Sequence, residues 1–101
     1  MIHVIASITV KDTQLESFIE IFKANIPNVM KENGCIEYSA TMDIETDVAI
    51  QQTDKNVVTV IEKWESLLHL KAHFTAPHML DYKSRVDDMV ETVSLKILQD
   101  S

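Results

Sequence analysis

The amino-acid sequence predicts an α+β fold, because segments with the two-residue periodicity of strands enclose longer segments with the periodicity of helices. The chain has 101 residues, which is the size of one typical domain. Its 46% hydrophobic and 25% charged residues are typical of a globular protein and argue against intrinsic disorder. We therefore expect one domain, spanning residues 2–98.

The first strand and the first helix are predicted near the N-terminus. Residues 2–10 alternate between two faces, as a strand does. A long helix is expected from about residue 13, because Thr13 and Glu16 have the spacing of a capping box and apolar residues follow at helical intervals. Pro27 is expected to kink this helix, since it removes one helical hydrogen bond. The only glycine, Gly34, is expected at the helix end, where a left-handed residue is common.

Two further strands are predicted in the middle of the chain, at residues 35–42 and 57–64. The second of them is rich in β-branched residues and carries apolar side chains on both faces. Residues 43–56 form a polar connection between them, in which residues 48–52 suggest a short additional strand. A strand that is apolar on both faces indicates that each face of the sheet is covered.

Two helices and a last strand are predicted in the C-terminal part. Ser66 is a plausible N-cap of a short helix, and Pro77 suits the first turn of another, whose apolar stripe extends to Val90. Alternation over residues 93–97 predicts the last strand. This element order is the ferredoxin-like arrangement. Helices in that fold cover one sheet face, so we expect a homodimer that packs sheet against sheet.

The charge of the chain excludes some classes of partner. Nine Lys and Arg against sixteen Asp and Glu give a net charge of −7, and there is no basic run. We therefore expect no nucleic-acid partner and no membrane insertion, since anionic surfaces repel such a chain. No signal peptide or apolar run of bilayer length is recognised. Cys35 is the only cysteine, so no internal disulfide forms, and we expect a cytoplasmic location.

Common catalytic motifs are missing from the sequence, including Gly-rich phosphate loops, the nucleophile elbow, CxxC and HExxH. His69 and His73 are four residues apart on a predicted helix, which is a spacing that metal-binding histidines use. The glutamate of the metalloprotease motif and a third ligand are missing. We therefore expect no metal site, and solvated helix histidines are the favoured interpretation.

His73 and His78 lie on the two sides of a predicted break between helices. His78 falls in the first turn of the second helix, where the positive end of the helix dipole favours the neutral imidazole that a general base needs. On the residues alone, the favoured interpretation is that either histidine caps a turn or packs beside Trp64.

Glu62 and Trp64 project from the same face of an otherwise apolar strand. A carboxylate there is costly unless it is paired or lines a cavity, and a structural ion pair is the simpler interpretation. Tyr38 and Trp64 have the aromatic surface to stack a flat ligand, although aromatic residues on strands are more often part of the core.

Together, these residues resemble the signature of the antibiotic-biosynthesis-monooxygenase (ABM) family, and most closely its bacterial quinol monooxygenase branch. The resemblance covers nearly the whole chain and is carried by ENGCIEY at residues 32–38 and VIEKWESLLHLKAHFTAPHM at residues 60–79. Within these segments the matching residues are Gly34, Cys35, Tyr38, Glu62, Trp64, His73 and His78.

The resemblance implies a dimeric ferredoxin-like α+β barrel with a pocket between sheet and helices in each subunit. Family members oxidise phenols or quinols with molecular oxygen and use no metal, flavin or haem. A deprotonated quinol donates electrons to oxygen itself, so the protein needs to supply only an apolar pocket, a base and orientation. The implied site has no cofactor, has His73 or His78 as base, and binds a small aromatic or quinol substrate through Tyr38, Glu62, Trp64 and Met79.

Two other functions of the same fold remain as alternatives. An isomerase of a phosphorylated signalling sugar would share the TAPH segment and needs cations for its phosphate, for which the candidates are Lys63, Lys71, Lys83 and Arg85. A non-catalytic dimeric domain would bind a small hydrophobic molecule. The haem-degrading branch is less similar, because it has an asparagine near the position of Ser7 and a tryptophan near that of His73.

Overall fold

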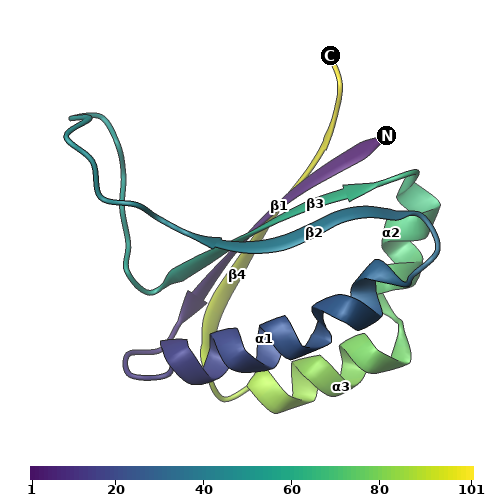
Figure 1. The fold of residues 1–101 in the computed structure, drawn as a ribbon, viewed down its shortest axis with the longest axis horizontal. Coiled ribbons are helices and arrows are strands. Elements are labelled where there is room, and N and C mark those ends of the chain that lie inside the picture. Colours follow the sequence, from purple (N-terminus) through teal and green to yellow (C-terminus); the bar gives the residue numbers. More distant parts are fainter.

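The computed structural model describes residues 1–101 and confirms the predicted α+β, ferredoxin-like fold (Figure 1). Its elements are β1 (Ile2–Val10), α1 (Leu15–Met30), β2 (Cys35–Met42), β3 (Val57–Trp64), α2 (Leu67–Phe74), α3 (Pro77–Val86) and β4 (Val90–Gln99). The four strands form one sheet in the order β2-β3-β1-β4, and all neighbours are antiparallel.

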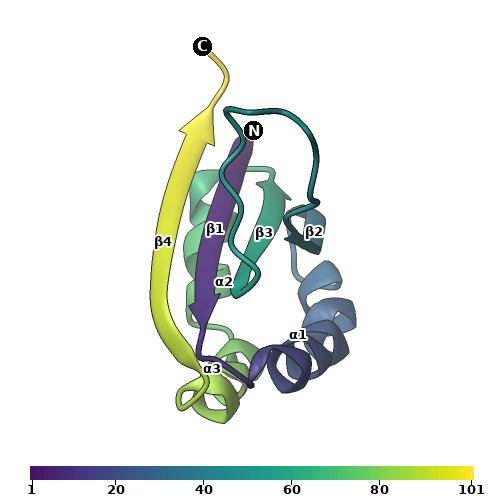
Figure 2. The same cartoon turned by 90° about the vertical axis from the view of Figure 1, so that its left-hand side faces the viewer.

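All three helices lie on one side of the sheet (Figures 1 and 2). On the central strands β1 and β3, alternate residues point toward the helices and are buried, as the two-residue period requires. Ala6 of β1 faces Val60 of β3 on one side and Leu95 of β4 on the other, so these residues share one face of the sheet. Phe18 and Phe22 of α1 complete the core above that face.

The first helix begins later than its sequence predicts. Thr13 has a φ of 71°, and the helix starts at Leu15 with Gln14 as its cap and no capping side-chain hydrogen bond. The capping box predicted for Thr13 and Glu16 is therefore wrong. Residues 11–14 instead form a tight turn, in which the amide of Gln14 donates to the carbonyl of Lys11 at 3.0 Å.

Gly34 has the left-handed conformation predicted for it, with a φ of 82°. The helix before it is continuous through Pro27 and ends at Met30. The carbonyl of Gly34 accepts a hydrogen bond from the amide of Glu65 at 2.9 Å, and a side chain at this position would overlap the ring of His69. Gly34 thus allows the connection between α1 and β2 to lie against the start of α2.

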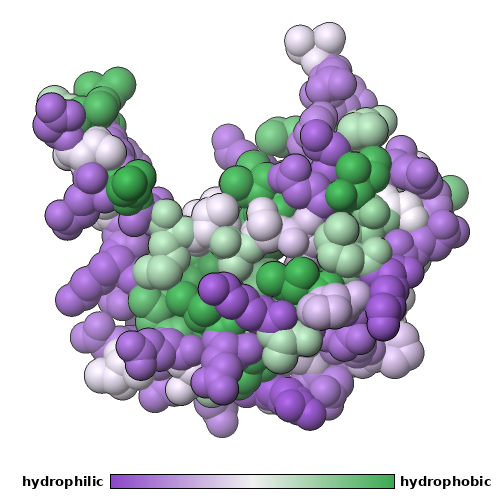
Figure 3. Space-filling view, in the orientation of Figure 1, coloured by the Kyte–Doolittle hydropathy of each residue, from purple (hydrophilic) through white to green (hydrophobic).

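The short strand suggested at residues 48–52 is wrong. These residues form a turn, in which the amide of Gln51 donates to the carbonyl of Val48 at 3.1 Å, and no strand pairs with them. Residues 43–56 project from the sheet as an arm (Figure 1), and hydrophobic side chains are visible on it in Figure 3. Ile44 and Ile50 on this arm are 74% and 91% exposed. A few residues of alternating polarity do not form a strand when no neighbouring strand offers backbone hydrogen bonds.

The C-terminal half confirms both predicted helix starts. The Ser66 side chain caps α2 by accepting from the amide of His69 at 3.3 Å, and Pro77 is the first residue of α3. Helix α3 ends at Val86, so assigning Val90 to its apolar stripe is wrong; Val90 begins β4. No helix is long and apolar enough to cross a bilayer.

Candidate active site

A cavity of about 430 Å³ lies between the sheet and the helices. Most of the side chains around it are hydrophobic, among them Ala6 and Val60 from the sheet and Phe22 from α1. Val93 and Leu95 of β4 also border it, and both remain partly exposed, so they form its rim. The cavity has the size and the apolar lining of a small-molecule site.

The polar side chains around the cavity are few and come from different elements. They are Tyr38 from β2, Glu62 from β3, His73 from α2, Tyr82 and Lys83 from α3, and Asp87 after α3. Such a small number of polar groups in an apolar wall can fix the orientation of a bound molecule.

His73 lies in the last turn of α2 and is 2% exposed. Its ring packs against Tyr38 and Trp64, with ring centroids 5.5 Å and 4.8 Å away. Nδ1 of His73 is 2.7 Å from Oε2 of Glu32, whereas Nε2 has no hydrogen-bond partner in the protein. Burial lowers the pKa of His73, and it outweighs the opposing effect of the Glu32 carboxylate. His73 is therefore a neutral imidazole with one ring nitrogen available.

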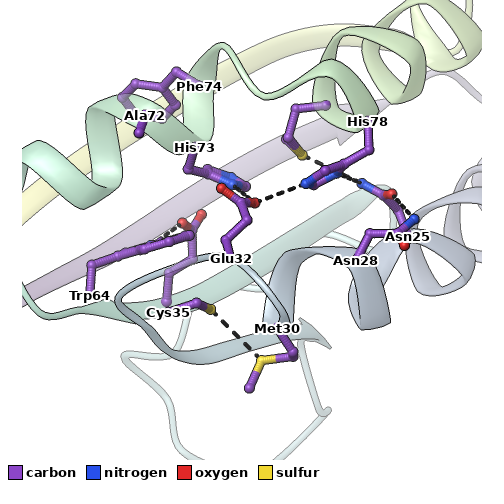
Figure 4. Close-up of polar contacts among 12 residues, drawn as sticks. Asn25, Asn28, Met30, Glu32, Cys35, Trp64, Ala72, His73, Phe74 and His78 are labelled. Atoms are coloured by element: carbon purple, nitrogen blue, oxygen red, sulfur yellow. Dashed lines mark hydrogen bonds and ion pairs between the residues drawn. The ribbon is translucent and has the colours of Figure 1, made fainter.

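Glu32 lies between the two predicted histidines and contacts both (Figure 4). Its Oε2 is 2.7 Å from Nδ1 of His73 and 3.1 Å from Nε2 of His78. The sequence pattern does not predict this role of Glu32. One signal was available: Glu32 follows the C-terminal end of α1, where the helix dipole disfavours a negative charge unless other groups compensate.

His78 lies in the first turn of α3, as its sequence predicts, but it does not border the cavity. It lines a second, more polar groove between α1 and α3, together with Asn25 and Asn28. Nδ1 of His78 is 3.2 Å from the side-chain nitrogen of Asn25. The two predicted histidines thus meet at one carboxylate, and only His73 reaches the cavity.

Glu62 is 5% exposed and forms no ion pair. The simpler interpretation of its sequence context, a structural ion pair, is therefore wrong. Oε1 of Glu62 accepts a hydrogen bond from the indole Nε1 of Trp64 at 3.0 Å. Burial raises the pKa of Glu62 and outweighs the lowering effect of this hydrogen bond. The raised pKa makes the carboxyl group of Glu62 easier to protonate than that of an exposed glutamate.

The other predicted binding residues divide into two groups. Tyr38 and Met79 border the cavity, whereas Trp64 is fully buried behind His73 and Glu62 and does not. Tyr82, to which the sequence analysis gave no site role, also borders the cavity. Burial and the nearby Glu62 raise the pKa of both tyrosines, so their hydroxyl groups stay protonated and can donate hydrogen bonds.

Two other chemically capable side chains lie outside the cavity. Nδ1 of His69 is 2.7 Å from Oγ of Ser66, so His69 does not join His73 in a common site.

No group of three or more His, Cys, Asp or Glu side chains is arranged to hold a metal ion. Burial and nearby Glu32 raise the pKa of Cys35 to about 11, which keeps its thiol protonated and a poor nucleophile.

Comparison with known proteins identifies the family. The family described as "Antibiotic biosynthesis monooxygenase" matches residues 1–85. The chain is 35% identical to the Escherichia coli K12 protein described as "Probable quinol monooxygenase YgiN" over 101 residues, which cover 98% of this chain and 97% of the relative.

Solved structures show the same fold at lower sequence identity. A conserved protein from Methanosarcina mazei Go1 aligns with a TM-score of 0.85 and 22% identity, over 99% of this chain and 92% of the other. A candidate antibiotic biosynthesis monooxygenase from Nitrosomonas europaea aligns with a TM-score of 0.85 and 20% identity, over 99% of this chain and 98% of the other. The family match and the E. coli relative together establish that this chain belongs to the antibiotic biosynthesis monooxygenase family.

Proposed function

We propose that this protein is a monooxygenase that oxidises a small quinol or phenol with molecular oxygen, with His73 as the general base and no cofactor. The observation that carries the proposal is the position of His73: a neutral imidazole on the wall of an apolar cavity, held at Nδ1 by Glu32, with Nε2 unpaired. A base in this setting can accept the proton of a bound hydroxyl group. The family and the E. coli relative support the same reaction class.

The reaction needs no external reductant, because the substrate supplies all four electrons. His73 takes the hydroxyl proton, and the resulting anion is electron-rich enough to reduce oxygen. One oxygen atom is inserted at a ring carbon that carried hydrogen, and the other leaves as water. In a phenol the inserted oxygen becomes the second carbonyl of a quinone. In a quinol the two original hydroxyl groups become the carbonyls, and the inserted oxygen is the hydroxyl of a hydroxyquinone, so atoms and electrons balance in both cases.

The remaining polar groups of the cavity suit the binding of a second substrate oxygen. Glu62 in its protonated form and the hydroxyl groups of Tyr38 and Tyr82 are hydrogen-bond donors that border the same space as His73. Phe22 and Met79 supply apolar surface for a ring. We propose that these residues orient the substrate, and that Trp64 contributes indirectly by packing against His73.

Oxygen uptake with a series of quinols in metal-free buffer tests this proposal. His73→Gln is expected to lower kcat about 100-fold or more, which is the usual loss when a general base is removed. His3→Gln is the matched control, because His3 lies at the N-terminal end of β1, where its side chain contacts Asp100 and does not border the cavity. An unchanged rate in His73→Gln would contradict the assignment of the base.

A sugar-phosphate isomerase is a second candidate, supported by one cation at the cavity. Lys83 borders the cavity, and its Nζ donates to the carbonyl of Phe74 at 3.3 Å. Arg85 pairs with Asp81 outside the cavity, so it offers little support for phosphate binding. Turnover of a phosphorylated substrate without oxygen uptake would favour the isomerase. Saturable quinone binding without any turnover would favour a non-catalytic binding domain.

We also propose that the protein works as a homodimer built from one ABM domain spanning residues 2–98, in the cytoplasm. The helices lie on one side of the sheet (Figure 1), which leaves Ile5 and Ile61 on a face that no helix covers. Val93 and Leu95 at the cavity rim are 59% and 43% exposed. A second copy would bury such surface. Gel filtration at twice 11.5 kDa is the expected result, and elution at 11.5 kDa would refute the dimer.

A further inference from the structure

The side-chain amide of Asn25 has an orientation that its neighbours determine. Nδ2 of Asn28 donates to Oδ1 of Asn25 at 3.0 Å, which places the oxygen of Asn25 on that side. The amide nitrogen of Asn25 then faces Sδ of Met79 at 3.5 Å and Nδ1 of His78 at 3.2 Å. A thioether sulfur accepts hydrogen bonds and never donates them, so it requires the nitrogen in this place.

This orientation determines which nitrogen of His78 carries the proton. Because Asn25 donates to Nδ1, that nitrogen accepts, and the ring proton of His78 lies on Nε2. Nε2 is fully buried and has no hydrogen-bond partner, and it lies 3.1 Å from Oε2 of Glu32. The contact is not aligned as a hydrogen bond, so the attraction between this N–H group and the carboxylate is mainly electrostatic.

The same carboxylate determines the tautomer of His73. An ionised carboxylate only accepts hydrogen bonds, so Nδ1 of His73, at 2.7 Å, must be the protonated nitrogen. The lone pair of a neutral His73 is then on Nε2, the nitrogen that has no protein partner. The two histidines therefore carry their protons on opposite nitrogens, although both contact Oε2 of Glu32.

We infer that Asn28, Asn25, His78 and Glu32 form an orienting chain that holds His73 with its proton on Nδ1 and its basic Nε2 toward the cavity. His78 is then a positioning residue that acts through Glu32 and is not the base. This inference rests on the proposed function where it names His73 as the base. The tautomers of the two rings follow from the contacts alone.

Ring nitrogen NMR on the wild-type protein tests the tautomers without any activity measurement. The expected result is a protonated Nδ1 in His73 and a protonated Nε2 in His78. In Glu32→Leu, which has no acceptor, the His73 ring is expected to lose its preference for Nδ1–H. Wild-type spectra in which both rings carry the proton on the same nitrogen would overturn the inference.

Two substitutions of His78 separate a positioning residue from a base. The amide of His78→Gln can still donate toward Glu32 but cannot accept a proton, whereas His78→Leu can do neither. The expected loss in kcat is about tenfold for His78→Leu and clearly smaller for His78→Gln, as the loss of one polar contact predicts. KM is expected to change little, since His78 does not border the cavity. Equal losses of about 100-fold in both variants would identify His78 as the base and overturn the inference.

Failure of the inference and failure of the proposed function give different results. If the wild type shows the expected tautomers but no oxygen uptake with any quinol, the orienting chain stands and the proposed reaction is wrong. If oxygen uptake depends on His73 but the ring protons are not on opposite nitrogens, the reaction stands and the orienting chain is wrong.

Discussion

Glu32 and Glu62 are two carboxylates near one cavity, and their surroundings give them opposite properties. Glu32 has two imidazole rings within 3.1 Å of one oxygen, so its negative charge has partners. Glu62 has only the indole N–H of Trp64, and burial raises its pKa. The difference shows that the neighbours of a buried carboxylate decide whether it accepts hydrogen bonds from charged or polar partners or holds its proton more tightly.

Of the two carboxylates, Glu32 is the one whose replacement by glutamine is expected to have the larger effect. Both imidazole nitrogens contact Oε2 of Glu32, and glutamine replaces this charged oxygen with a neutral amide group, which removes the charge that stabilises a protonated His73. We expect kcat for quinol oxidation to fall about 100-fold. Glu37→Gln is the matched control, because Glu37 is an exposed glutamate on β2.

Steady-state oxygen uptake for both variants gives the answer. A wild-type rate in Glu32→Gln would mean that Glu32 does not orient the base. Circular dichroism and urea unfolding of the same samples would show whether a loss of activity arises from a loss of the fold.

Replacement of Glu62 is expected to affect stability through Trp64. Glu62→Leu leaves the buried indole N–H of Trp64 without its acceptor, which costs about 1–3 kcal/mol. Glu62→Gln keeps an acceptor oxygen and is expected to cost clearly less. Urea unfolding of the two variants measures the difference in the free energy of unfolding, and equal values would show that the hydrogen bond to Trp64 contributes nothing.

The smallest expected effect is on the pH dependence of the free energy of unfolding. This dependence reflects the difference between the pKa of Glu62 in the folded and in the unfolded state. The pKa of Glu62 is raised on folding, so the folded state holds its proton more tightly. The contribution of Glu62 to stability is therefore present below its unfolded pKa of about 4.3 and is lost as pH rises through the folded pKa.

The Glu62→Gln variant has no ionisable side chain at this position and serves as the reference. The free energy of unfolding of the wild type minus that of Glu62→Gln is expected to fall as pH rises above about 4.3. The lowered pKa of His73 acts in the opposite direction, since it favours the fold at higher pH, but it is present in both proteins and cancels in the difference. A difference that does not change with pH would show that Glu62 ionises normally.

The sequence predicts most of this fold because periodicity is a local property. All four main strands and the three helices follow from the spacing of apolar residues. The errors fall where distant contacts decide the structure: the turn at Thr13, the unpaired segment 48–52 and the start of β4 at Val90. A turn or an edge without a partner strand leaves no periodic signal.

The candidate site was predictable in part, for the same reason. Tyr38, Glu62, His73 and Met79 stand out as polar, aromatic or thioether residues within periodic elements, and all border the cavity. Glu32 does not, because it lies in the connection after α1 and meets His73 of α2 only through the tertiary fold, across 41 positions of sequence. Likewise, the separation of His78 from the cavity depends on how α3 packs beside α1.

A structure of the protein with a bound quinol, or with an analogue that oxygen cannot oxidise, is the decisive test of His73 as the base. We expect the ligand ring in the cavity and one ligand oxygen within about 2.6–3.2 Å of Nε2 of His73. Glu32 should remain in contact with Nδ1 of the same ring. A ligand oxygen bound to His78 in the groove between α1 and α3 would contradict His73 as the base. So would a ligand bound to Lys83 with no ligand atom near His73.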